Sequence, residues 1–235
     1  MPRDDQQDAG LVIAINLPTA DQVHSDFAVD LARLVSYTAH HFGDKIEAIL
    51  VNSVRGSIVH KSRQALAEQA EEQRADYSLW IDSDMRFPRD ALVRLLSREQ
   101  DIVGVNYVTR QQPMHYVAIK NEVTADGPGE YLATKIDSEG LEEAAAIGFG
   151  MVLIHGSVWG KLGPAPWFLF DYDRDLDVPI GEDVYFCRLA REAGINIMVD
   201  HDLSKEIRHI GQWEFKLAHM AMLEAAYEEE QADAS

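Results

Sequence analysis

Two aspartates, Asp82 and Asp84, stand directly after a short apolar segment of the chain. Residues 77–81 read as a buried strand, which would carry both carboxylates to its carboxyl end. In an open α/β sheet, ligands bind at that edge. Two carboxylates so close together repel each other unless a cation lies near them. Oxygen ligands of this kind suit Mg²⁺ or Mn²⁺, which commonly bind together with a substrate diphosphate. The pair therefore indicates a metal site for a nucleotide-linked substrate.

The same residues allow a purely structural explanation. Asp82-Ser83-Asp84 stands just before Phe87-Pro88 and could form a polar turn that leads into a helix beginning near Arg89. Aspartate and serine are common in turns because their side chains hydrogen-bond to nearby backbone groups. This segment alone does not decide between a metal site and a turn, so the rest of the chain has to be considered.

A second group of polar residues lies later in the chain. Glu182 and Asp183 stand at the start of a predicted helix, where Asp183 could act as a general base. Acidic residues are also favoured there by the helix dipole alone. His209 precedes Ile-Gly and could be an ordinary polar residue. Two carboxylates and one imidazole nevertheless form a plausible set of ligands for a divalent metal.

Composition limits the class of protein. The 235 residues fit one α/β domain, and an apolar content of 46% can form a substantial core. Forty acidic residues against 21 basic ones give a net charge of -19, which disfavours nucleic acid and anionic membranes as partners. The single cysteine, the polar N-terminus and the lack of a long apolar run predict a soluble, cytoplasmic protein without an integral membrane segment.

Apolar periodicity predicts one domain over residues 11–211, a disordered lead-in at 1–10, and a C-terminal helix with an acidic tail at 212–235. Strands alternate with helices up to residue 105, so we expect a mostly parallel sheet flanked by helices. An antiparallel excursion is expected between about residues 115 and 155, with a hairpin around Asp126-Gly127. The predicted strands are 11–15, 46–51, 77–81, 101–105, 144–155 and 195–199, and the predicted helices are 27–43, 61–74, 88–97, 182–193 and 213–230.

Taken in order, these features resemble the GT-A glycosyltransferases, especially the small glycosyltransferase-like proteins of phages and bacteria that are related to the inverting family 2 enzymes. The resemblance covers roughly residues 11–211 and depends on the ordered set rather than on any one motif. The matching segments are Pro18 after the first strand, Lys61-Ser62-Arg63, the DxD motif Asp82-Ser83-Asp84, Gly104-Val105-Asn106-Tyr107 with Arg110 and Pro113, Gly148-Phe149-Gly150, Glu182-Asp183, and His209-Ile210-Gly211.

The resemblance implies a role for each matching residue. Asp84, Asp82 and His209 would hold Mn²⁺ or Mg²⁺, with Asp82 also able to contact the ribose of a nucleotide-sugar donor. Asp183, with Glu182 beside it, would deprotonate the hydroxyl of a saccharide or other acceptor. The residues implied on the donor side are Pro18, Arg63, Asp82, Ser83 and Arg110.

Three other functions compete with this one. A haloacid-dehalogenase-like phosphatase also has Asp-x-Asp after a strand, but that strand usually comes first, and Thr or Val stands where this chain has Arg86. A nucleotidyltransferase normally begins with a glycine-rich loop, which Asn16-Leu17-Pro18-Thr19 lacks. A non-catalytic GT-A-like protein that binds nucleotide sugars remains open on the sequence.

Overall fold

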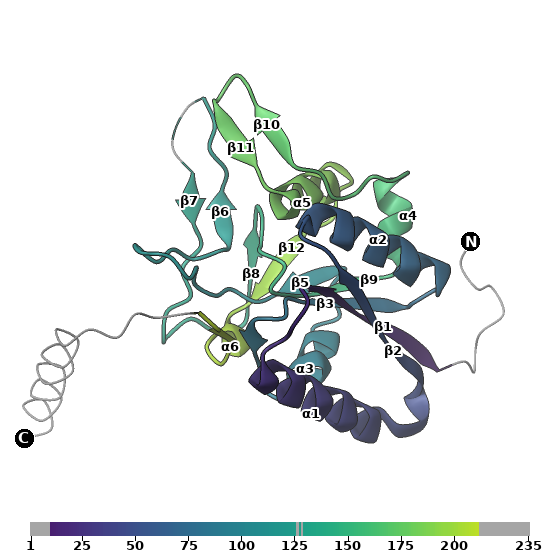
Figure 1. The fold of residues 1–235 in the computed structure, drawn as a ribbon. Helices are drawn as coiled ribbons and strands as arrows, with labels where there is room; N and C mark the ends of the chain where they lie inside the picture. Colours follow the sequence, from purple (N-terminus) through teal and green to yellow (C-terminus); the bar gives the residue numbers. More distant parts are fainter. Residues whose placement is uncertain (1–9, 126, 128, 212–235) are drawn as a thin grey trace, which may run out of the picture.

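A seven-stranded sheet forms the centre of the protein, seen in a computed structural model that describes residues 10–125, 127 and 129–211 (Figure 1). Its strands in chain order are β1 (Leu11–Thr19), β2 (Ile46–Arg55), β3 (Tyr77–Ile81), β5 (Ile102–Gly104), β8 (Leu141–Ala144), β9 (Met151–His155) and β12 (Ile197–Asp200). Across the sheet they follow the order β2-β1-β3-β9-β5-β12-β8. The pairings make β9 and β8 antiparallel to the other strands, so most of the sheet is parallel.

Helices cover both faces of this sheet (Figure 1). They are α1 (Ser25–Phe42), which runs into the short 3-10 helix η1 (Gly43–Lys45), then α2 (Val59–Glu72), α3 (Ala91–Ser97), α4 (Ser157–Leu162), α5 (Glu182–Glu192) and α6 (His201–Ser204). Side chains alternate between the faces along each strand. Leu79 and Ile81 of β3 pack in the apolar cluster with α1 and α3, whereas Trp80 packs in the cluster with α2, α4 and α5. The core therefore has two layers, one on each side of the sheet.

Three small two-stranded sheets are added at the margin of this core. Strand β4 (Met85–Arg86) pairs with β13 (Arg208–His209), β6 (Ile119–Asn121) with β7 (Glu130–Tyr131), and β10 (Asp171–Asp173) with β11 (Val178–Ile180). In Figure 1 the β6–β7 and β10–β11 pairs project together from the upper left of the molecule. The β4–β13 pair matters most for the site, because it joins the segment after β3 to residues more than a hundred positions later.

The predicted α/β architecture is confirmed, including the sheet shared by residues 11–15 and 79–81 and the hairpin between β6 and β7. Strand β1 is longer than predicted and includes Pro18, which was predicted to follow the strand. Its pairing with β3 stops at Asn16, so Pro18 lies where β1 pairs with β2 alone. A proline, which has no N–H to donate, is tolerated where a strand has one neighbour.

The prediction of one strand over residues 144–155 is wrong, because the chain forms β8 and β9 with a loop between them. Gly148 and Gly150 lie in that loop, and a Cβ on either would come within 2.7 Å of the Tyr107 side chain. The two glycines therefore allow close packing of an aromatic ring rather than the continuation of a strand. The predicted C-terminal helix and all of the predicted lead-in except Gly10 lie outside the described residues.

Aromatic residues between positions 159 and 170 are mostly part of the core. Trp159, Trp167 and Phe168 are buried, while Phe170 is 62% exposed. Cys187 is also buried, and burial raises the pKa of its thiol to about 12, so it is protonated at neutral pH.

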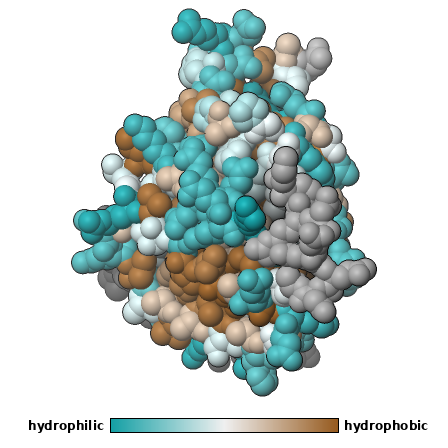
Figure 2. Space-filling view, turned by 90° about the vertical axis from the view of Figure 1, so that its right-hand side faces the viewer, coloured by the Kyte–Doolittle hydropathy of each residue, from teal (hydrophilic) through white to brown (hydrophobic). Residues whose placement is uncertain are grey.

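The edge of the sheet at β2 is apolar and partly open to solvent. Figure 2 looks toward this side and shows apolar residues gathered in its lower half. Val51 of β2 is 49% exposed, and β2 pairs with β1 alone. Among the described residues, no helix has both the length and the apolar character needed to cross a membrane.

Candidate active site

The two aspartates of the DxD motif lie where β3 ends, as the sequence predicts. The backbone N–H of Asp82 donates to the carbonyl of Gly150 at 3.1 Å, and a turn brings the Met85 N–H to the Asp82 carbonyl at 3.2 Å. Strand β9 runs antiparallel to β3, so Gly150, just before β9, lies at the same edge. The side chains of Asp82 and Asp84 are 27% and 21% exposed, respectively. Both carboxylates are therefore largely shielded from water.

Arg63 connects the DxD motif to the start of α5. Its guanidinium is buried, with Nη2 lying 3.0 Å from Asp82 Oδ1 and Nη1 lying 2.5 Å from Glu182 Oε1. The Phe149 ring lies beneath it, 5.1 Å from the guanidinium carbon. A planar guanidinium can bind two carboxylates at once, which a lysine ammonium does less well. Arg63 thus fixes α2, the end of β3 and the start of α5 relative to one another.

Burial and charge shift several pKa values around Arg63. Burial raises the pKa of Asp82 above its ordinary value, although the charge and hydrogen bonds of Arg63 oppose the shift. Burial likewise raises the pKa of Asp183, whose Oδ1 accepts a hydrogen bond from the Val184 N–H at 2.8 Å. Burial lowers the pKa of Arg63, but nearby Asp82, Glu182 and Asp183 outweigh it and the net shift is upward. A raised pKa brings Asp183 closer to the range of an effective general base.

His209 reaches Asp84 through the pairing of β13 with β4. His209 lies opposite Met85 in this ladder, and the Ile210 N–H donates to the Asp84 carbonyl at 2.7 Å. His209 Nε2 lies 3.6 Å from Asp84 Oδ2, and Arg110 Nη1 lies 2.8 Å from the same oxygen. Partial burial acts to raise the pKa of Asp84, but His209 and Arg110 overcome it and the pKa is lowered. Asp84 therefore stays ionised at neutral pH.

The groups around Asp84 fit a divalent cation held in part by a substrate. His209 Nδ1 lies 2.9 Å from the Val108 carbonyl, which can only accept, so neutral His209 carries its proton on Nδ1 and has a lone pair on Nε2. Asp84 Oδ1 is buried without a hydrogen-bond partner among the described residues. In the same part of the chain, no three His, Cys, Asp or Glu side chains are grouped to hold a metal by themselves. The protein would thus supply Asp84 and His209, leaving other positions for diphosphate oxygens and water.

The three metal ligands predicted from the sequence are not all brought together. Asp84 and His209 are neighbours, whereas the Asp82 carboxylate pairs with Arg63. Pro18 lies at the carboxyl end of β1 opposite Val54, and Ser83 lies partly exposed in the turn between the two aspartates. Arg63, predicted on the donor side, is engaged by two carboxylates, and Arg110 is half exposed beside Asp84.

Tyr107 is a member of the site to which the sequence analysis assigned no role, although it lies in one of the matching segments. Its hydroxyl accepts a hydrogen bond from the Gly150 N–H at 3.0 Å, and its ring meets the His209 ring edge-on at 5.2 Å between centroids. Burial, with the negative charges of Asp82 and Asp183, strongly raises the pKa of this phenol. The glycines at 148 and 150 were the available signal, because such a pair indicates close approach of another group.

Replacing Gly150 with alanine should destabilise the protein by about 1–3 kcal/mol, the usual cost of overpacking. The new Cβ would lie 2.5 Å from Tyr107 Cζ, so the ring supporting His209 would have to move. Urea unfolding measures the change in the free energy of unfolding. Gly160→Ala is the matched control, since a Cβ there meets nothing within 4 Å and α4 should gain up to about 1 kcal/mol. Equal stabilities for the two variants would contradict the packing argument.

The summed charge of the site favours a cation. Four carboxylates, those of Asp82, Asp84, Glu182 and Asp183, face two guanidinium groups, those of Arg63 and Arg110. With His209 neutral, the difference is two negative charges. A bound dication would balance that difference, and an anionic diphosphate would be repelled without one.

Comparisons with known proteins bear on the fold. Neither family models nor curated proteins match this sequence. A crystal structure of A197 from STIV superposes with a TM-score of 0.49 and 14% identity, over 88% of this chain and 97% of that one. A crystal structure of GalNAc-T7 with UDP, GalNAc and Mn²⁺ superposes with a TM-score of 0.51 and 11% identity, over 87% of this chain.

The second likeness identifies the architecture. GalNAc-T7 is a glycosyltransferase with the GT-A fold. The fold of this chain is GT-A-like. At 11% identity the likeness extends to the fold alone, and the match spans only 44% of the GalNAc-T7 chain. The fold expected from the ordered motifs is therefore confirmed, while the residue roles stay predictions.

Proposed function

We propose that this protein is a metal-dependent glycosyltransferase that moves a sugar from a nucleotide-diphosphate donor to an acceptor hydroxyl with inversion. The observation that carries the proposal is the pairing of Asp84 with His209 at the end of β3, beside a buried cluster that contains Asp183. A GT-A-like fold around these residues supports the same chemistry.

Each residue has a defined task in this proposal. Asp84 and His209 Nε2 would hold Mn²⁺ or Mg²⁺, which would offset the charge that develops on the leaving diphosphate. Asp183 would accept the proton of the acceptor hydroxyl as the oxygen attacks the sugar carbon. Arg63 holds Asp82 and Glu182 in place and so fixes the end of β3 against the start of α5. This arrangement would orient donor and acceptor for reaction.

Asp84→Ala should abolish the metal-dependent part of nucleotide binding, because it removes the charged ligand that shares the cation with the diphosphate. Calorimetric titration with UDP, in the presence and absence of Mn²⁺, measures this directly. Wild-type protein should bind UDP more tightly with Mn²⁺, and Asp84→Ala should bind it equally weakly in both conditions. His209→Ala should reduce the Mn²⁺ effect by about 10-fold or more.

Asp44→Ala provides the control, because Asp44 is an exposed aspartate in η1. The control should retain the full Mn²⁺ effect. If Asp84→Ala also retained it, the metal assignment would be wrong.

A non-catalytic protein that binds nucleotide sugars is the second candidate, and one contact favours it. Arg110 Nη1 lies 2.8 Å from Asp84 Oδ2, which places a positive charge where a metal would bind. Arg110 could then contact a diphosphate without any metal. Release of free UDP from a UDP-sugar separates the two candidates, since a binding protein would not accelerate it.

A further inference from the structure

A groove opens between two hairpins beside the helix that carries Asp183. The residues of one wall come from the β6–β7 hairpin, and those of the other come from β11 and the beginning of α5. The groove has a volume of about 370 Å³. Its lining is mainly apolar and includes Ile119, Val123, Tyr131, Val178, Pro179 and Val184. Val123 and Tyr131 are 42% and 52% exposed, so apolar surface is open to a ligand.

Residues that line the groove are close in sequence to Asp183, the proposed general base. Strand β11 ends at Ile180, and only Gly181 and Glu182 separate it from Asp183. Val184, the next residue, lines the groove together with Arg188 one helical turn later. Asp183 lies on a different side of α5, close to Arg63. The groove therefore reaches the beginning of α5, one residue along the chain from Asp183, and an acceptor held there would reach the carboxylate by passing around this end of the helix.

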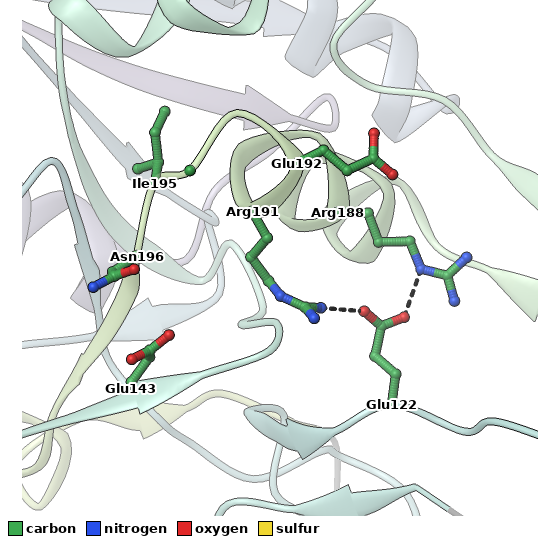
Figure 3. Close-up of a pocket in the computed structure, with 8 residues that line it drawn as sticks. Glu122, Glu143, Arg188, Arg191, Glu192, Ile195 and Asn196 are labelled. Carbon is green, nitrogen blue, oxygen red and sulfur yellow. Dashed lines mark hydrogen bonds and ion pairs between the residues drawn. The ribbon is translucent and has the colours of Figure 1, made fainter. Parts of the chain in front are cut away.

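An ion-pair bridge separates this groove from a second cavity. The Glu122 carboxylate, just after β6, lies 2.5 Å from Arg188 Nε and 2.7 Å from Arg191 Nη1 of α5. Figure 3 shows both ion pairs. Glu122 and Arg188 line both the groove and the second cavity, which has a volume of about 440 Å³. The bridge therefore ties the β6–β7 hairpin to α5 and forms a polar boundary for the apolar groove.

The charge of the lining selects against an anionic occupant. The charged residues of the groove are Glu122, Glu130 and Arg188, two carboxylates against one guanidinium. Arg188 is already paired with Glu122. A phosphate or sulfate group would thus meet net negative charge, whereas an uncharged apolar group would bury apolar surface on both sides.

We propose that the groove binds an uncharged alkyl or aryl group of the acceptor and so presents the acceptor hydroxyl to Asp183. The acceptor would then be a hydroxyl compound with an apolar aglycone rather than a free sugar or an anionic lipid. This inference rests on the proposed function, because it assigns the substrate class of that same site.

Binding of two glucosides to the full-length protein tests the proposal without donor or metal. Methyl β-D-glucoside and n-octyl β-D-glucoside, the latter below its critical micelle concentration, share a sugar and differ only in the alkyl chain. Calorimetry should show the octyl compound binding at least about 10-fold more tightly, as burial of two methylenes would produce. Equal affinities would overturn the proposal.

Four variants, one of them a control outside the groove, test whether the alkyl chain binds in the groove. Val123→Ser and Tyr131→Ala should each reduce the preference for the octyl compound by at least about 3-fold, because each removes apolar contact surface. Val123→Ile should retain the preference. Val51→Ser is the matched control, since Val51 is 49% exposed on β2, at the other edge of the sheet. An octyl preference that survived in both Val123→Ser and Tyr131→Ala, or that fell equally in Val51→Ser, would also overturn the proposal.

The results distinguish an error in the groove proposal from an error in the proposed function. An absent octyl preference, together with a normal Mn²⁺ effect on UDP binding, would reject the apolar acceptor and leave the transferase intact. A clear octyl preference without a Mn²⁺ effect on UDP binding would reject the metal site and leave the apolar groove as a binding site.

Discussion

Arg63→Met should lower the free energy of unfolding by about 3–5 kcal/mol, because it leaves buried carboxylates without their cation. Arg63 is 4% exposed and pairs with Asp82 and Glu182, while its charge also acts on Asp183. Methionine retains much of the length and apolar surface of the arginine stem, so the lost stability would come mainly from charge. For a domain of this size, the loss corresponds to a fall in Tm of about 10 °C.

Arg110→Met is the control for this prediction. Arg110 also pairs with a DxD aspartate, but its side chain is 49% exposed, so the loss should stay below about 1 kcal/mol. Urea unfolding at several pH values separates charge from packing. Without Arg63, the folded-state pKa values of Asp82 and Asp183 rise further, so the variant takes up protons more readily when folded than when unfolded. Its deficit should therefore shrink as pH falls below these raised pKa values. A deficit that was independent of pH would indicate lost packing instead.

Local patterns in the sequence predicted most of the sheet and the end of β3. Leu79, Trp80 and Ile81 are apolar because both faces of the strand are covered, and the carboxylates follow where the strand reaches the surface. The ordered motifs also indicated the GT-A-like fold. Such signals depend on residues close together in the chain, or on motif order, and both can be read without coordinates.

Long-range pairing was less accessible to sequence analysis. The sequence predicted that Asp82 would share a metal with Asp84, but the buried Arg63 from α2 pairs with Asp82. No local pattern indicates which of several arginines reaches a carboxylate 19 positions away. Likewise, the split between β8 and β9 follows from the Tyr107 ring, which packs against glycines more than 40 residues later. These features depend on tertiary packing, which overrides local preference.

Asp183→Asn should lower the turnover rate by about 10²-fold or more while leaving donor and metal binding nearly unchanged. Asparagine keeps the size of the side chain and an oxygen that can accept from the Val184 N–H. It cannot accept the proton of an acceptor hydroxyl. Turnover at saturating UDP-sugar and acceptor measures the loss, and UDP titration with Mn²⁺ checks binding. Asp175→Asn, an exposed aspartate outside the buried cluster, should retain wild-type turnover.

The pH dependence of the turnover rate distinguishes a catalytic role of Asp183 from a structural one. A general base must be ionised, so wild-type turnover should fall as pH drops through the pKa of Asp183, which burial raises above the ordinary aspartate value. Asp183→Asn should lose this acidic limb, because asparagine does not titrate. If the variant instead binds donor poorly but turns over normally at saturation, Asp183 is a binding residue. The base would then have to be sought at Asp171 or Asp173, or in a retaining mechanism, since Glu182 is held by Arg63.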